Sequence, residues 1–442
     1  MFKTFVNAIK IKEVRKKLLF TLAMLVVIRI GSQLPVPGVY REYFSIWFEN
    51  QRQNVGDAWG FFDAFTGGSF TSMSVFALNI TPYITSSIIM QLLTIAIPKL
   101  EEMNKEEDGR KKIASITRYV TVALALIEAA ALAIGFGNQG LLEPANRTLI
   151  NYVSIISAMT AGSTLLMWLG ERITENGVGN GISIVLVINI ISRMPSDIQV
   201  LFRTFVFSAT NAGKSVLAAV IILAVIIATV VLVVYLNAGV RKIPVQYAKK
   251  VQGSRMVGAN NSHIPLRVNT AGVIPIIFAS SLMQFPVVIC SLFGVDTTGT
   301  WGEIMKGLQT NYWFNTAQPV YTLGLLLYVV LVVFFAYFYT SITFNPMLVA
   351  DNMKKSGGFI PGIRPGKPTT EYLTGVLNYI IFMGAIGLII VAIIPIFFNG
   401  VFSARVSFGG TSLIIVVSVV LETLSQIETM MLERNYKGFL NA

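Results

Sequence analysis

Residues Val216–Leu236 read VLAAVIILAVIIATVVLVVYL, an apolar run without a charged side chain. An α-helix rises about 1.5 Å per residue, so a run of about 20 residues crosses the hydrocarbon core of a lipid bilayer, which is about 30 Å thick. Polar and apolar residues do not alternate here, as they would in a strand of a membrane β-barrel. We therefore interpret this run as a helix that spans a membrane.

Apolar runs of this kind occur along the whole chain. Of the 442 residues, 54% are hydrophobic and 13% are charged, and the mean hydropathy is +0.67. A water-soluble protein could not bury that much apolar surface, and a backbone in lipid must satisfy its own hydrogen bonds. The predicted fold class is all-α, a polytopic membrane protein with ten transmembrane helices in the runs Leu18–Leu34, Val75–Ile97, Tyr119–Phe136, Val153–Leu169, Ile182–Ile191, Val216–Leu236, Val268–Leu292, Val320–Ile342, Val376–Phe398 and Leu413–Met431.

The basic residues are divided unevenly between the two sides of the membrane. Most of the 34 Lys and Arg residues lie in the N-terminal segment, in every second connection between runs and in the C-terminal tail. Cytoplasmic loops of membrane proteins carry such an excess of positive charge, so both termini are predicted to be cytoplasmic. A turn at Pro35–Gly38 follows the first run instead of a cleavage site, so we interpret that run as a retained helix.

Three of the runs are irregular. The fifth extends over only about 20 Å even if it continues to Met194, so we expect it to be shielded by neighbouring helices or to face water. The second and seventh runs each open with an asparagine, Asn79 and Asn269, and are soon broken by Pro82 and Pro275. Irregular helices in transport proteins mark the substrate pathway. The matching positions also fit two repeats of five helices, which the pattern alone leaves open.

Side chains for catalysis are scarce. One cysteine, Cys290, and one histidine, His263, exclude a disulfide framework, a thiolate cluster and a histidine-based metal site. Gly213–Ser215 lacks the first glycine of a phosphate-binding loop. We predict no catalytic residue, no metal, no cofactor and no enzymatic activity. Arg29 and Glu128 are charged residues inside runs, and a structural tie, for example between the two, and a functional role are both open.

The segment Trp59–Phe70 is aromatic, but it is too short, too acidic and too rich in glycine to cross a membrane. It fits either a re-entrant segment or an amphipathic segment on the outer membrane surface. The residues alone favour the surface segment.

Two long connections on the predicted cytoplasmic side, residues 239–267 and 345–371, exceed what a small-solute transporter needs. The first contains six basic residues and no acidic one. The second contains GGFIPGIRPG, which predicts a hairpin with Arg364 at or near its tip. Setting the membrane topology is one explanation for these charges, and a large anionic partner such as RNA or an acidic protein surface is the other.

Five motifs occur in order along the chain: Ile80–Gln91 (ITPYITSSIIMQ), Gly179–Ser183 (GNGIS), Pro265–Phe278 (PLRVNTAGVIPIIF), Asn345–Gly366 with its ADNMKKSGGFIPGIRPG core, and Phe408–Ile415 (FGGTSLII). They resemble the SecY family of protein-conducting channels over essentially the whole chain. The resemblance implies two pseudo-symmetric five-helix halves around a central pore. It divides the chain into a cytoplasmic segment 1–17, an N-terminal half 18–194, a connector 195–214, a C-terminal half 215–431 and a cytoplasmic tail 432–442.

The resemblance also implies three sets of pore residues. An apolar ring that seals the pore corresponds to Ile80, Ile84, Ile182, Leu186, Ile277 and Ile415, with Ile190 as a possible further member. The segment 59–70 matches the plug of the family, against the surface position favoured above, and includes Phe61, Phe62, Phe65, Gly67 and Gly68. The second and seventh spans match the lateral gate, with the polar residues Thr85, Ser86, Gln91, Asn269 and Gln284.

The function implied is translocation of unfolded secretory polypeptides across the bacterial plasma (inner) membrane and sideways release of membrane helices into the lipid bilayer. Expected partners are SecE-like and SecG-like membrane subunits, a SecA motor, the ribosome with its rRNA, signal peptides and nascent chains. Partner docking is assigned to Arg241, Lys249, Lys250, Arg255 and Arg364. The competing class is a secondary transporter with a solute site at the midplane, which requires a polar pocket there. An intramembrane hydrolase would require a catalytic dyad or metal ligands inside the spans.

Overall fold

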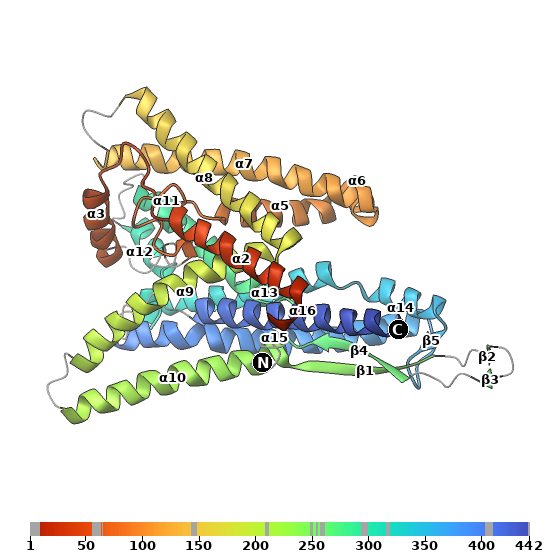
Figure 1. Cartoon of the computed structure of the whole chain (residues 1–442). Coiled ribbons are helices and arrows are strands. Elements are labelled where there is room, and N and C mark those ends of the chain that lie inside the picture. Colours follow the sequence, from red (N-terminus) through yellow and green to blue (C-terminus); the bar gives the residue numbers. More distant parts are fainter. Residues whose placement is uncertain are drawn as a thin grey trace.

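The computed structural model describes residues 9–54, 63, 65–142, 148–207, 212–247, 251–252, 255–256, 261–292, 299–314, 319–402 and 410–440. Each of the ten apolar runs overlaps a helix (Figure 1). The N-terminal helices are α2 (Lys12–Gly31), α3 (Arg41–Asn54), α5 (Thr81–Ala96), α6 (Pro98–Lys105), α7 (Glu107–Asn138), α8 (Leu149–Asn176) and α9 (Gly181–Phe202), which continues as the π-helix η2 (Arg203–Phe207). The C-terminal helices are α10 (Ala212–Ala238), α11 (Ile274–Leu292), α12 (Thr300–Gly307), α13 (Thr322–Thr343), α14 (Pro346–Lys355), α15 (Lys367–Phe402) and α16 (Gly410–Leu440), with short 3₁₀ turns at Thr310–Tyr312 and Pro319–Tyr321.

Within the described ranges, seven helices are long and apolar enough to cross a membrane: α7, α8, α9, α10, α13, α15 and α16. The pair α5 and α6 provides an eighth span if it is counted as one, although its two helices are bent by 104°. Helix α11 is apolar but shorter, and α2 begins with a basic segment that includes Arg15, Lys16 and Lys17. The prediction of a helical, multi-pass membrane protein is confirmed.

The helices form two groups that meet along α2, α9 and α16. On one side α7 packs against α5 and α8, and on the other side α13 packs against α11 and α15. Helix α9 contacts both α8 and α16 and therefore connects the two groups. In Figure 1, α6, α14 and the strands lie toward one end of the molecule, whereas α3 and α12 lie at the opposite end.

Pro82 and Pro275 begin helices rather than breaking them. Pro82 is the second residue of α5, and Pro275 is the second residue of α11. Proline is tolerated in the first helical turn because the N–H group that it lacks has no partner within the helix there. Both apolar runs are therefore interrupted at these prolines, as predicted, but a helix follows each interruption and none precedes it within the run. Both helices start inside the bundle, and the apolar residues that precede them are not helical.

The prediction of a short fifth helix is wrong. Helix α9 runs to Phe202 with Pro195 inside it, and η2 extends it to Phe207. Its apolar run stops at Arg193 and Asp197, whose charges are paired and largely buried instead of exposed. The charges that end the hydropathy signal therefore do not end the helix.

The chain is not purely helical, because both long connections contribute strands. Strand β1 (Val240–Tyr247) pairs antiparallel with β4 (Asn261–Arg267), and β2 (Val251–Gln252) pairs with β3 (Arg255–Met256) farther out. The buried face of β1 packs on α14 and α15 through Ile243 and Val245. The predicted hairpin around Arg364 is not formed: β5 (Gly358–Phe359) pairs with the end of β1, and turns connect it to α15.

Candidate functional site

The six residues of the predicted ring lie in one buried apolar cluster, here called the waist cluster. Its buried members include Ile80, Leu186, Ile190 and Ile415, and the half-buried ring residues Ile84, Ile182 and Ile277 pack against them. They come from four places in the chain: the start of α5, the first turns of α9 and α11, and the second turn of α16. The structure therefore brings together residues that are as far apart in sequence as Ile80 and Ile415.

Local backbone features place these isoleucines. The side chain of Asn180 accepts hydrogen bonds from the N–H groups of Ile182 (3.1 Å) and Ser183 (3.4 Å), which fixes the first turn of α9. A Cβ atom at Gly181 would overlap the backbone oxygen of Gly170, so only glycine allows α9 to begin this close to α8. The structure thus explains Asn180 and Gly181 of the GNGIS motif by their local contacts, independently of any family resemblance.

The described part of the predicted plug lies against the waist cluster. Phe65 is 8% exposed and belongs to that cluster. Gly67 has φ +65°, and a Cβ atom there would lie 2.8 Å from the backbone of Asn189 on α9, so this close approach requires glycine. Phe61 and Phe62 lie outside the described residues.

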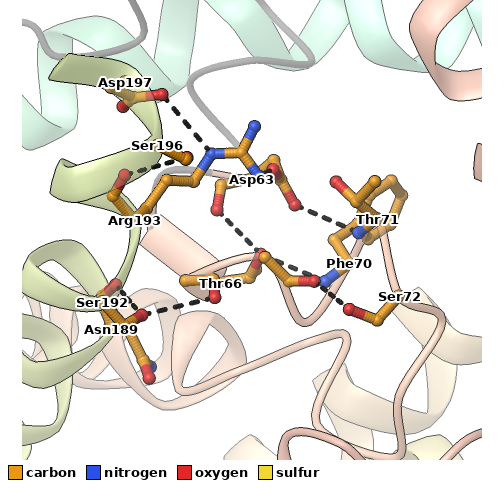
Figure 2. Close-up of polar contacts among 12 residues, drawn as sticks. Asp63, Thr66, Phe70, Thr71, Ser72, Asn189, Ser192, Arg193, Ser196 and Asp197 are labelled. Atoms are coloured by element: carbon orange, nitrogen blue, oxygen red, sulfur yellow. Dashed lines mark hydrogen bonds and ion pairs between the residues drawn. The ribbon is translucent and has the colours of Figure 1, made fainter. Parts of the chain in front are cut away.

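Polar contacts hold this segment to α9 (Figure 2). Arg193 forms an ion pair with Asp63, and the other carboxylate oxygen of Asp63 accepts a hydrogen bond from the N–H of Thr71 at 3.0 Å. The hydroxyl of Ser192 donates to the carbonyl oxygens of Asn189 (2.7 Å) and, at 3.4 Å, of Gly67. Asp63 and Arg193 were not among the predicted site residues. Arg193 could have been found, because it is a charged residue that ends the fifth apolar run.

Asn79 connects the plug segment to two helices. Its amide nitrogen donates to the carbonyl oxygen of Phe65 (2.6 Å), and its amide oxygen accepts from the side chain of Asn189 (3.0 Å). Its own carbonyl oxygen accepts from Ser163 on α8 at 2.9 Å. Asn79 adopts φ +52°, a left-handed conformation that asparagine tolerates better than most residues. The asparagine that opens the second run is therefore a contact of the plug segment.

Arg29 contributes to the same region. Its guanidinium donates a hydrogen bond to the hydroxyl of Ser192 at 3.0 Å, and Ser192 is the residue that contacts Gly67. The sequence left open an interaction between Arg29 and Glu128, but the hydrogen bond that Arg29 forms in the structure is to Ser192. Its hydrogen bond supports the contact between α9 and the plug segment.

The polar residues assigned to the gate on α5 bond within their own half. The hydroxyl of Ser86 is buried and lies 2.5 Å from that of Thr121 on α7. Thr85 donates to a carbonyl group one turn earlier in α5, and Gln91 donates to Ser87 at 3.4 Å. The contact between Ser86 and Thr121 thus joins α5 to α7, whereas the bonds of Thr85 and Gln91 lie within α5.

The gate residues of the other half behave in the same way. Asn269 donates to the side chain of Asn237 on α10 (2.8 Å), which in turn donates to Ser418 on α16 (2.8 Å). Gln284 is buried on α11, and its side-chain oxygen accepts no hydrogen bond from the described part of the chain. Among the described residues, the hydrogen bonds of Thr85, Ser86, Gln91 and Asn269 thus join partners within one group of helices.

The residues assigned to docking are only partly described. Arg241 is exposed on β1 and Arg255 belongs to β3, whereas Lys249 and Lys250 lie outside the described residues. Arg364 is exposed in the turns before α15, and its carbonyl oxygen accepts a hydrogen bond from Thr369 at 2.8 Å. The strands and these turns lie at the same end of the molecule (Figure 1).

This geometry favours a barrier over a chemical reaction. An apolar constriction disfavours hydration and therefore the passage of ions, and it offers no hydrogen-bond partner to a passing chain. The described residues contain no group of three or more His, Cys, Asp or Glu side chains that could hold a metal ion.

Known proteins are similar to this chain in sequence and in fold. The SecY family model matches residues 74–424. The protein translocase subunit SecY of Halalkalibacterium halodurans is 43% identical over 448 residues, and that of Bacillus subtilis strain 168 is 41% identical over 448 residues. Each alignment covers 100% of both chains.

Solved structures share the fold at lower sequence identity. One comes from work on how the plug domain of SecY stabilises the closed channel and maintains a membrane seal, with a TM-score of 0.63, 20% identity and coverage of 94% of this chain and 92% of the other. Another is Sec61 in a canine ribosome–channel complex from the endoplasmic reticulum, with a TM-score of 0.59, 18% identity and the same coverage. From the family match and the full-length identity, we conclude that this chain belongs to the SecY family.

Proposed function

We propose that this chain is the central subunit of a protein-conducting channel that moves unfolded secretory polypeptides across the bacterial plasma membrane. The observation that carries the proposal is the waist cluster, in which six apolar residues from four separate segments come together and which also contains Phe65. Family membership supports the same activity. The chain acts as a channel and not as an enzyme, so the energy for transport comes from its partners.

In this mechanism the ring and the plug have different tasks. The ring of Ile and Leu side chains surrounds a passing polypeptide without binding it, because the side chains offer only apolar contacts. Phe65 fills the space beside the ring while the channel is idle, and it leaves when a polypeptide enters. A secondary transporter would require a polar solute site at the midplane, whereas the residues at the matched ring positions are all Ile or Leu.

The seam between α5 and α11 is proposed as the lateral gate through which membrane helices enter lipid. Helix α5 packs on α7, and α11 packs on α13. The hydrogen bonds of Thr85, Ser86, Gln91 and Asn269 stay within their own halves. The two halves, residues 18–194 and 215–431, could therefore separate along this seam without breaking those bonds.

The end of the molecule that carries the strands, α6 and α14 is proposed to face the cytoplasm, together with both termini. The excess of basic residues in the connections at this end supports that orientation. Docking of a ribosome is supported by the relatives of this fold that were solved in ribosome complexes. A SecA motor, SecE-like and SecG-like subunits, and anionic rRNA as a contact of the basic loops complete the proposed set of partners.

A transport experiment tests the function. The purified chain, reconstituted into vesicles with SecE-like and SecG-like subunits, SecA and ATP, is expected to protect a secretory precursor from added protease. The matched control is the same precursor with charged residues in its signal sequence. Protection of neither precursor, in vesicles shown to contain inserted chain, would contradict the proposal.

The plug assignment gives a second prediction. In a Cys290→Ser background, a cysteine at Phe65 should react slowly with a membrane-impermeant thiol reagent added from the outer side, because this side chain is buried in the waist cluster. When a precursor is trapped in the channel, the reaction should become much faster. A cysteine at Tyr43, which is exposed on α3, serves as the control and should react equally in both states. Equal reactivity of the residue-65 cysteine in idle and occupied channels would contradict its role as a plug.

A further inference from the structure

Three charged side chains meet where the plug segment touches α9. Arg193 lies between Asp63 on the plug segment and Asp197 one turn farther along α9 (Figure 2). The side chains are 16%, 0% and 8% exposed, respectively. A buried charge destabilises the protein unless it is paired, so moving a carboxylate away from Arg193 has a free-energy cost.

The two carboxylates hold Arg193 differently. Asp63 contacts the Nη1 atom of the guanidinium directly, whereas the Oδ1 atom of Asp197 is 3.9 Å from the Nε atom. A Cβ atom at Gly68 would lie 3.7 Å from Nη1, so the glycine turn of the plug segment lies directly beside the guanidinium. The direct contact is thus made to the plug segment, and the looser contact is made within α9.

Departure of the plug would remove Asp63 and leave Arg193 beside Asp197. A lone guanidinium in this position would oppose departure strongly, because breaking a buried ion pair leaves an uncompensated charge. Asp197 changes that balance, because its carboxylate remains beside the guanidinium on α9. Arg193 therefore has one carboxylate that belongs to the plug segment and one that belongs to its own helix.

We propose that Arg193 is a two-position latch that helps to set how readily a signal sequence opens the channel. In the idle state it holds Asp63 and keeps the plug in place. When the plug leaves, Arg193 pairs with Asp197, which stabilises the open state. The inference rests on the proposed plug, and it assigns opposite effects to two carboxylates that contact the same guanidinium.

Two neutralising substitutions separate this latch from a merely structural charge cluster. Asp63→Asn weakens the contact of the idle state, so the ion leak of idle channels should rise about tenfold, the factor that about 1.4 kcal/mol produces. Transport of a precursor with a weakened signal sequence should rise with it. Asp197→Asn removes the acceptor of the open state, so transport of the same precursor should fall while the leak stays at or below that of the unsubstituted channel.

The experiment measures both quantities for both variants in planar bilayers and in vesicles. Asp63→Glu, which retains the charge, is the control and is expected to leak less than Asp63→Asn. Labelling of a cysteine at residue 65, with Cys290 replaced, reports the plug position in each variant independently of transport. More leak and more labelling for Asp63→Asn, together with less weak-signal transport for Asp197→Asn, would support the latch.

Other results would overturn it. If both variants raise the leak, Asp197 only supports the packing of α9, and the transfer of Arg193 is wrong. If neither the leak nor the labelling changes for Asp63→Asn, the ion pair does not hold the plug. Absence of transport by the unsubstituted chain would instead contradict the proposed function, while the leak and the labelling would still decide whether Asp63 and Arg193 hold this segment.

Discussion

Substitution of Ile415 by Asn is expected to raise the ion leak of the resting channel by roughly 5- to 150-fold, the range that about 1–3 kcal/mol produces. Ile415 is 1% exposed and contributes to the waist cluster from α16. An amide in a dry apolar ring has no hydrogen-bond partner, and an unsatisfied buried polar group costs about 1–3 kcal/mol. Water can satisfy the amide only by entering the ring, so the substitution favours the hydrated, conducting state.

The adjacent residue provides a matched control. Ile414 is fully buried, but it belongs to a different cluster, formed with α11, α13 and α15, and not to the waist cluster. Ile414→Asn should therefore lower the stability of the protein without producing a comparable leak. Ile277→Asn should behave like Ile415→Asn, because Ile277 lies in the waist cluster. Single-channel conductance in planar bilayers measures all three, and unchanged conductance for both ring variants would remove these residues from the ring.

The sequence predicted the helices well because lipid imposes a simple rule. A membrane helix must be apolar over about 20 residues, and the run Val216–Leu236 follows the rule closely enough to be located by hydropathy. The rule failed where other contacts replaced lipid. Helix α9 passes through Arg193 and Asp197 because a carboxylate from the plug segment neutralises the guanidinium, and a hydropathy window contains no information about that partner.

The strands of the first long connection were missed for a different reason. Ile243, Val245 and Tyr247 occupy every second position in the second half of β1, with Pro244 and Gln246 between them, and such a period of two is typical of a half-buried strand. Because the long connections were interpreted as loops, this pattern was not used to predict a strand. The hairpin around Arg364 was predicted but is not formed. Gly and Pro residues predict turns, but they do not identify the strand with which β5 pairs, which is β1.

The ring was predicted from the family resemblance, and physical patterns alone had indicated only irregular helices. Ile80 and Ile415 are 0% and 1% exposed, yet isoleucine is so common in this chain that nothing in its local sequence distinguishes these two. The polar contacts of the plug were not predicted at all. Asn79 and Asp63 act through contacts with α8 and α9, and such long-range contacts depend on the tertiary fold.

Arg364→Glu is expected to abolish most motor-driven transport while leaving the closed channel intact. Arg364 is exposed in the turns before α15, and its carbonyl oxygen accepts a hydrogen bond from the hydroxyl of Thr369. If it pairs with an acidic group of a docking partner, loss of that pair costs about 2–5 kcal/mol, and the new like-charge contact adds repulsion. The affinity for the partner should then fall by more than tenfold, because each 1.4 kcal/mol is about a factor of ten.

Lys367→Glu separates docking from topology, because it makes the same change in charge only three residues away. Lys367 is the first residue of α15, where a carboxylate is compatible with the helix dipole, so the fold should tolerate it. If these charges only orient the chain in the membrane, the two variants should behave alike, since orientation depends on the sum over the loops. Precursor transport with SecA, the resting leak and protease-probed topology are measured for each variant. Lost transport for Arg364→Glu alone, with normal leak and topology in both, assigns docking to Arg364, whereas equal transport by the two variants leaves Arg364 only a topological role.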